Sequence, residues 1–168
     1  MLLRVIQTAQ RLATKRGPVF KAVYTAFQLK DSTGLAPALL HIPSRGAKEH
    51  KSRFSTVGIC ILQSLLNFKV AHVRAVIESI ANMEASVLTA LACDSAGSRL
   101  LESVFKLLHH SEARLRVAHK FLGAFVQLAC HPCASFVLDS LFAHSDAAVR
   151  RAVAEELAGA VARLVRIH

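Results

Sequence analysis

Three stretches of this chain repeat one pattern of apolar residues. In each stretch a small residue is followed by apolar residues three, four, seven and eight positions later. The sets are Gly58, Ile61, Leu62, Leu65 and Leu66; Gly97, Leu100, Leu101, Val104 and Phe105; and Ala134, Val137, Leu138, Leu141 and Phe142. Because an α-helix turns once in 3.6 residues, this spacing gathers the apolar side chains on one helical face. Each stretch is therefore predicted to be an amphipathic helix.

The polar positions between them repeat as well. The three helices read GICILQS from residue 58, GSRLLES from residue 97 and ASFVLDS from residue 134, which sets them 39 and 37 residues apart. Before the last two, ALACD at 90–94 matches QLACH at 127–131. A fixed interval of this size indicates a repeat protein, in which each unit buries its apolar face against the next.

Further helical segments flank each copy. Short apolar segments precede the second and third copies at 84–92 and 121–129, and an amphipathic segment follows each copy. In the segment after the second copy, the spacing predicts Leu115, Ala118 and Leu122 to be buried, with Arg114, Arg116 and Lys120 exposed. The unit is thus predicted to contain three helices, and the fold to be an all-α, right-handed α-solenoid.

The repeats are expected at 54–82, 83–121 and 122–168. Residues 1–30 are predicted to be a degraded N-terminal helical unit, although the best segment for alignment, GPVFKAVYTAF at 17–27, matches the repeat poorly. Residues 31–53 are predicted to be a basic loop. This segment contains Gly34, Pro37, Pro43 and Gly46, and a basic run follows.

The charge of the chain changes this picture by indicating a partner. The net charge is +10, and residues 1–53 hold 10 Lys and Arg against 2 acids, whereas residues 54–168 hold 11 against 9. Such a basic excess favours a polyanionic partner, with nucleic acid first and an anionic membrane surface second. No apolar run approaches the 18 residues of a membrane span, so no membrane insertion is expected.

The acid-free first 30 residues are also compatible with a mitochondrial presequence. However, Leu2, Val5, Ile6, Ala9 and Leu12 form a stripe typical of a core-facing helix, which favours a first helical hairpin.

The cysteines are the most conspicuous candidate for other chemistry. No signal peptide precedes Cys60, Cys93, Cys130 and Cys133, so a disulfide framework is not expected. The Cys-His-Pro-Cys motif at 130–133 has neither the βαβ context of a redox site nor a second ligand pair at zinc-finger spacing. No cofactor, metal or enzymatic activity is therefore predicted, and the adjacent Glu155 and Glu156 are read as surface charge.

The repeated segment resembles a known family. GSRLLE at 97–102 is similar to the pattern G-[SNC]-[RYH]-V-x-[QE] of PUF (Pumilio) RNA-binding repeats. TALACDSAGSRLLES at 89–103 and GAFVQLACHPCASFVLDS at 123–140 resemble, within that superfamily, the nucleolar Pumilio-like proteins of small-subunit ribosome biogenesis (nucleolar protein nine). The resemblance covers residues 54–160.

The resemblance implies a binding site for single-stranded RNA on a concave surface, with one base read per repeat by two or three side chains. In the second copy Ser98 and Glu102 take the edge-reading places and Arg99 the stacking place. Residues four apart share a helix face, and an ionised glutamate only accepts hydrogen bonds. Since guanine offers adjacent donors, Ser98 with Glu102 is predicted to favour guanine.

The other two copies depart from the family pattern. In the third copy Ser135 and Asp139 take the edge-reading places, and Phe136 is a candidate stacking platform. Asp139 is one methylene shorter than a glutamate, which reduces its reach. In the first copy Ile59 replaces the first reader and Cys60 the stacking residue, which leaves Gln63 as the remaining reader.

The resemblance therefore implies a monomeric RNA-binding solenoid of the nucleolus or nucleus that contacts pre-rRNA, with ribosome-assembly proteins as further candidate partners. The main alternative is a protein-binding α-solenoid of the HEAT or armadillo type. A Cys-x-x-Cys oxidoreductase is the third reading, and a mitochondrial location is the alternative if the basic N-terminus is a presequence.

Overall fold

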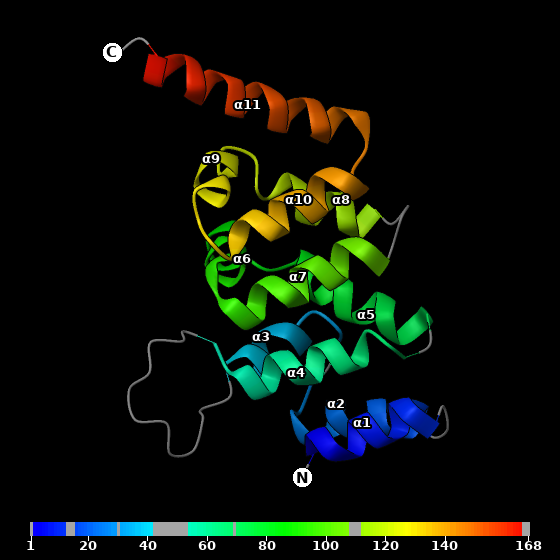
Figure 1. Cartoon of the computed structure of the whole chain (residues 1–168). Coiled ribbons are helices and arrows are strands. Elements are labelled where there is room, and N and C mark those ends of the chain that lie inside the picture. Colours follow the sequence, from blue (N-terminus) through cyan, green and yellow to red (C-terminus); the bar gives the residue numbers. More distant parts are fainter. Residues whose placement is uncertain are drawn as a thin grey trace, which may run out of the picture. The chain divides into compact units, whose positions relative to one another are not determined.

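The computed structural model describes residues 2–12, 16–29, 31–41, 54–68, 70–107 and 112–165. Within these ranges every regular element is an α-helix, and no strand is present (Figure 1). The helices are α1 (Leu2–Leu12), α2 (Arg16–Ala26), α3 (Leu35–Leu40), α4 (Thr56–Leu65), α5 (Val70–Ala81), α6 (Ala85–Cys93), α7 (Ser95–Leu107), α8 (Glu112–His119), α9 (Phe125–Ala129), α10 (Ala134–His144) and α11 (Ala147–Val165). They form two compact units, Met1–Met83 and Glu84–His168. The predicted all-α class is confirmed.

The unit Glu84–His168 contains two successive sets of three helices. In each set a short helix (α6 or α9) precedes a long one (α7 or α10), and a third helix (α8 or α11) follows. The two long helices, α7 and α10, pack directly against each other, and each also packs on its own short helix. The apolar positions predicted for α7 are all buried, as are those for α10 except Phe142, whose side chain is 44% exposed.

A glycine allows the short and long helices to approach closely. A Cβ atom at Gly97 of α7 would lie 2.6 Å from Cδ1 of Leu91 on α6, and would overlap the carbonyl oxygen of Leu91. Any side chain at this position would therefore push the two helices apart. The small first residue of the repeat pattern is thus a packing requirement.

The unit Met1–Met83 contains the same arrangement. Here α3, α4 and α5 pack on one another, while α1 packs on α2 and α4 (Figure 1). A Cβ atom at Gly58 of α4 would overlap the backbone of Leu39 on α3, including its carbonyl oxygen. The short helix α3 therefore takes the place before α4 that α6 takes before α7.

The prediction of a loop over residues 31–53 is wrong for residues 35–40, which form α3. Its four buried residues, Leu35, Ala36, Leu39 and Leu40, belong to the core. Pro37 does not prevent the helix, because the first-turn amides of a helix have no intrahelical acceptor in any case. Residues 42–53, the remainder of the predicted basic loop, lie outside the described residues.

A buried serine attaches α3 to α5. The hydroxyl of Ser79 accepts a hydrogen bond from the amide of Ala36 (2.7 Å) and donates one to the carbonyl of Thr33 (2.8 Å). Ser79 is fully buried, so both partners satisfy groups that water cannot reach. These long-range contacts explain why the local Gly- and Pro-rich composition was misleading.

The predicted orientation of the segment that contains α8 is right for Ala118, which is buried, and wrong for Arg114 and Leu122. Ala113, Val117 and Ala118 are buried, and Arg114 is only 4% exposed, whereas Leu122 is largely exposed. Burial lowers the pKa of the Arg114 guanidinium, and the nearby charge of Asp146 raises it. Arg114 is therefore buried because it lies next to Ala113, Val117 and Ala118, which form the packing face of this helix.

Glu156 has a structural role beyond the surface charge that was predicted. Its carboxylate on α11 accepts hydrogen bonds from the amides of Gly123 (2.9 Å) and Val126 (3.2 Å). It therefore fixes the segment between α8 and α9 to the last helix, and satisfies amides at the start of α9.

Substituting Gly97 tests the packing requirement. Gly97→Ala should lower the free energy of unfolding by roughly 1–3 kcal/mol, because the new methyl overlaps Leu91. The matched control is Gly159→Ala in α11, where an added Cβ meets nothing within 4 Å. That change should raise stability by about 0.5–1 kcal/mol through helix propensity. Chemical denaturation of the two variants measures both effects, and equal stability would contradict the packing argument.

Substituting Glu156 tests its bonds to the segment before α9. Glu156→Gln should cost about 1–2 kcal/mol, because the charge-assisted bonds to the Gly123 and Val126 amides are weakened at a half-buried site. Glu155→Gln changes the neighbouring exposed carboxylate and should alter stability by less than about 0.5 kcal/mol. Thermal melts of both variants at low and high salt distinguish the specific bonds from a general charge effect.

Candidate nucleic-acid interface

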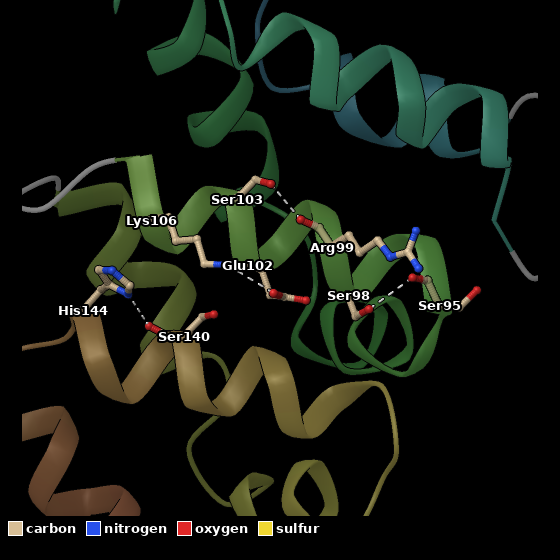
Figure 2. A network of polar contacts seen from close by, with 8 residues as sticks. All are labelled: Ser95, Ser98, Arg99, Glu102, Ser103, Lys106, Ser140 and His144. Atoms are coloured by element: carbon tan, nitrogen blue, oxygen red, sulfur yellow. Dashed lines mark hydrogen bonds and ion pairs between the residues drawn. The ribbon is translucent and has the colours of Figure 1, made fainter.

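Helix α7 begins at a well-formed cap and presents two charged candidates. The carboxylate of Asp94 accepts hydrogen bonds from the amides of Ala96 and Gly97, both at 2.9 Å, which satisfies free donors of the first turn. Further along, Arg99 is exposed and Glu102 is half-buried (Figure 2). The structure thus leaves the Arg99 guanidinium and the Glu102 carboxylate accessible from solvent.

Glu102 has a partner that the sequence reasoning missed. Nζ of Lys106 lies 3.3 Å from Oε2 of Glu102, in the i, i+4 geometry that favours ion pairs on helices (Figure 2). The Lys106 side chain is 56% exposed and that of Glu102 is 21% exposed. The four-residue spacing of the two charges was the signal that could have identified this pair.

Ser98 does not present its hydroxyl as predicted. The residue is only 4% exposed, and its Oγ donates a hydrogen bond to the carbonyl of Ser95 at 3.2 Å (Figure 2). Ser98 and Glu102 share a helix face, but a serine side chain ends close to the backbone, whereas a glutamate reaches outward. Ser98 is thus less accessible than Glu102, and the reading of one base edge by both residues stays a prediction.

Helix α10 presents the corresponding residues of the next repeat. Phe136 is 59% exposed, Asp139 is exposed and Ser135 is half-buried, with its hydroxyl 3.3 Å from the carbonyl of Pro132. In the repeat alignment Phe136 corresponds to Arg99 of α7, and Asp139 corresponds to Glu102. Since α7 and α10 pack together, equivalent positions of neighbouring helices both carry accessible groups.

The start of α10 is capped by the histidine of the Cys-His-Pro-Cys motif. Nδ1 of His131 accepts hydrogen bonds from the amides of Cys133 (3.2 Å) and Ala134 (3.4 Å). His131 aligns with Asp94, so the two side chains perform the same capping role in successive repeats. The histidine in this motif therefore serves the helix that carries Phe136.

The candidates on α4 lie in the unit Met1–Met83. Ile59 is fully buried, so its prediction as an RNA-contacting residue is wrong: the side chain belongs to the core of its unit. Cys60 and Gln63 are half-buried. The side-chain amide of Asn67 donates a hydrogen bond to the backbone carbonyl of Gln63 at 3.0 Å.

The four cysteines all lie in the described part of the chain and are free thiols. Among those residues, no group of three or more His, Cys, Asp and Glu side chains is arranged to hold a metal ion. Burial raises the pKa of the Cys93 thiol, and Cys133 raises it further. A raised pKa reduces the thiolate fraction, which makes Cys93 less reactive.

No single described helix is both long and apolar enough to cross a membrane, and only the bent pair His72–Ala81 with Ala85–Cys93 meets the criteria of length and composition when both are taken together.

Curated relatives match most of this chain. Pumilio homolog 23 of Arabidopsis thaliana is 31% identical over 112 residues, which cover 67% of this chain and 14% of that protein. Nucleolar protein 9 of Homo sapiens is 28% identical over 141 residues, which cover 83% of this chain and 22% of that protein. This chain therefore spans less than a quarter of either relative's length.

Solved structures match the fold. The structure of APUM23 with GGAUUUGACGG has a TM-score of 0.75 at 25% identity, over 89% of this chain and 30% of that one. The structure with GGAAUUGACGG has a TM-score of 0.76 at 25% identity, over 90% and 30%. The protein-family model described as the NOP9-like PUF repeat domain matches residues 1–166. The predicted resemblance is thus confirmed in preference to a HEAT or armadillo fold, and the chain belongs to the NOP9-like PUF repeat domain family.

Proposed function

We propose that this chain binds single-stranded RNA through the exposed residues of α7 and α10. The observation that carries the proposal is the exposure of Arg99 and Phe136 at equivalent positions of two packed repeat helices. Phe136 is 59% exposed, so much of its apolar surface is available for a ligand to cover. A nucleobase is such a ligand, because every base has a planar face.

Arg99 and Phe136 supply two planar groups for stacking. Bases stack on aromatic rings and on guanidinium planes, and each stacked base contributes about 1–3 kcal/mol. Because both residues occupy the stacking place of their repeats, they would contact successive bases of one strand. Arg99 can also pair with a phosphate, since its guanidinium is permanently charged.

Glu102 is the proposed base-reading residue. Its carboxylate only accepts hydrogen bonds, and guanine is the base that offers two adjacent donors on its Watson–Crick edge. Nζ of Lys106 pairs with this carboxylate at 3.3 Å and orients it. The positive charge of Lys106 would also attract a phosphate group of the RNA strand. Because Ser98 is buried, the guanine preference rests on Glu102. Asp139 is the weaker reader in the next repeat.

The relatives support a role in ribosome biogenesis. APUM23 has been solved with guanine-containing sequences such as GGAUUUGACGG, and one relative is named Nucleolar protein 9. We infer that the RNA bound by this chain is pre-rRNA of the small subunit and that the chain acts in the nucleolus, as a monomer alongside ribosome-assembly proteins.

Two substitutions test this proposal by fluorescence polarisation with single-stranded oligonucleotides. Phe136→Ala should weaken binding about five- to hundred-fold for any sequence, because a stacking platform is lost. Glu102→Gln should reduce the preference for guanine roughly ten-fold, because the amide replaces an acceptor by a donor.

Matched controls lie on the same unit. Phe142→Ala removes a partly exposed ring from α10 at a position outside the reader pattern, and Glu112→Gln neutralises an exposed carboxylate of α8. Neither should change RNA affinity more than about two-fold. Absence of measurable binding by the unsubstituted chain at low salt would contradict the proposed function.

A further inference from the structure

The positive charge of the chain is concentrated in one of its two units. The unit Met1–Met83 contains 12 Lys and Arg and 3 acids, a net charge of +9, whereas Glu84–His168 contains 9 and 8, a net charge of +1. The helices α7 and α10, which carry the proposed RNA-contacting residues, thus lie in the nearly neutral unit. The excess of positive charge that indicates a polyanionic partner lies in the unit Met1–Met83.

Within the basic unit, α1 and α2 contain no acidic residue at all. Arg4 and Arg11 are both exposed on α1, and seven residues separate them. That spacing is close to two helical turns, so the two guanidinium groups leave α1 on the same side, with their Cα atoms about 10 Å apart. On α2, Lys21 is exposed as well.

These three cations are unpaired among the described residues. No ion pair or hydrogen bond of their side chains is formed there, and the only acids in the described part of this unit are Asp31 and Glu78. Asp31 is engaged locally, because its carboxylate accepts hydrogen bonds from the amide and the hydroxyl of Thr33. Arg4 and Arg11 of α1 and Lys21 of α2, two helices that pack on each other, are together named the α1–α2 surface, and their charge is available to an external anion.

The other side of α1 is occupied by the fold. Ile6 is fully buried and Ala9 is nearly so, since α1 packs on α2 and α4. A helix that inserts into a membrane surface needs its apolar face free. Because that face of α1 is already covered, an anionic bilayer is a poorer ligand than a flexible chain of phosphates.

We propose that the α1–α2 surface is a sequence-independent docking site for the phosphate backbone of single-stranded RNA, separate from the base-reading residues of α7 and α10. The proposal rests on the proposed RNA binding. Lysine and arginine that neutralise phosphates release condensed counterions, which adds affinity without base preference. Affinity and specificity are thereby assigned to different units of the chain.

The test is the salt dependence of RNA binding by the full chain. Each phosphate contact on a single strand contributes about 0.7 to the slope of log affinity against log salt concentration. The triple variant Arg4→Gln, Arg11→Gln, Lys21→Gln should therefore lower that slope by about 2 and weaken binding at 0.1 M salt by roughly a hundred-fold. Guanine-containing and guanine-free oligonucleotides should lose affinity equally.

Two control variants separate charge from fold and from position. Arg4→Lys with Arg11→Lys keeps the charge and should keep the slope. Arg151→Gln removes an exposed cation from α11 in the nearly neutral unit and should leave the slope unchanged. Helical content and melting temperature by circular dichroism confirm that each variant is folded.

The outcomes distinguish this inference from the function on which it rests. If the unsubstituted chain binds RNA and the folded triple variant keeps its slope, the docking site is refuted while RNA binding stands. If the triple variant instead loses only binding to vesicles of phosphatidylserine and phosphatidylcholine, the surface is a membrane contact and the inference is overturned. Loss of salt-dependent RNA affinity in the triple variant, with base preference retained, supports it.

Discussion

The close approach of a short helix to the long helix that follows it is the contact on which this fold depends. In both units the long helix has a glycine in its first turn whose missing side chain makes room for the backbone of the preceding helix, at Gly58 against Leu39 and at Gly97 against Leu91. The apolar stripe of the long helix starts at this glycine. The contact therefore fixes the rotation of the long helix about its own axis, and with it the direction of every outward residue.

Caps and single polar side chains then hold the flanking segments in place. Asp94 and His131 each satisfy two amides at the start of a long helix, and Ser79 and Glu156 attach segments that are distant in sequence. Amides buried without a partner are costly, so these side chains stabilise the chain out of proportion to their size. The third repeat has Ala134 in place of the glycine, which shows that α9 and α10 leave room for one methyl group.

In the proposed function, the packing of α7 on α10 lets an exposed arginine and an exposed phenylalanine act together. Two planar groups on helices packed against each other would form a preorganised surface, which would lower the entropic cost of ordering an RNA strand. The uneven charge of the two units complements this, because Coulombic attraction to phosphate acts at longer range than stacking and does not require precise geometry. A modest number of repeats can then combine affinity with some selectivity for bases.

Much of this architecture was determined by the sequence alone. The spacing of apolar residues identified α4, α7 and α10 and their buried faces. The recurrence of motifs similar to GSRLLES indicated the family. Both inferences were possible because helical periodicity and repeat register are properties of the linear chain. The exposure of Arg99, Phe136 and Asp139 followed from the same register.

Only the tertiary structure decided which short or atypical segments belong to the core. Helix α3 lies in a Gly- and Pro-rich segment, and it forms because Ser79 and Gly58, both far along the chain, provide its hydrogen bonds and its packing surface. The same holds for side chains at the edge of a predicted face: Ser98 and Arg114 are buried because of neighbours in space. Sequence periodicity gives the direction of a side chain from its own helix, whereas exposure also depends on how close the next helix comes.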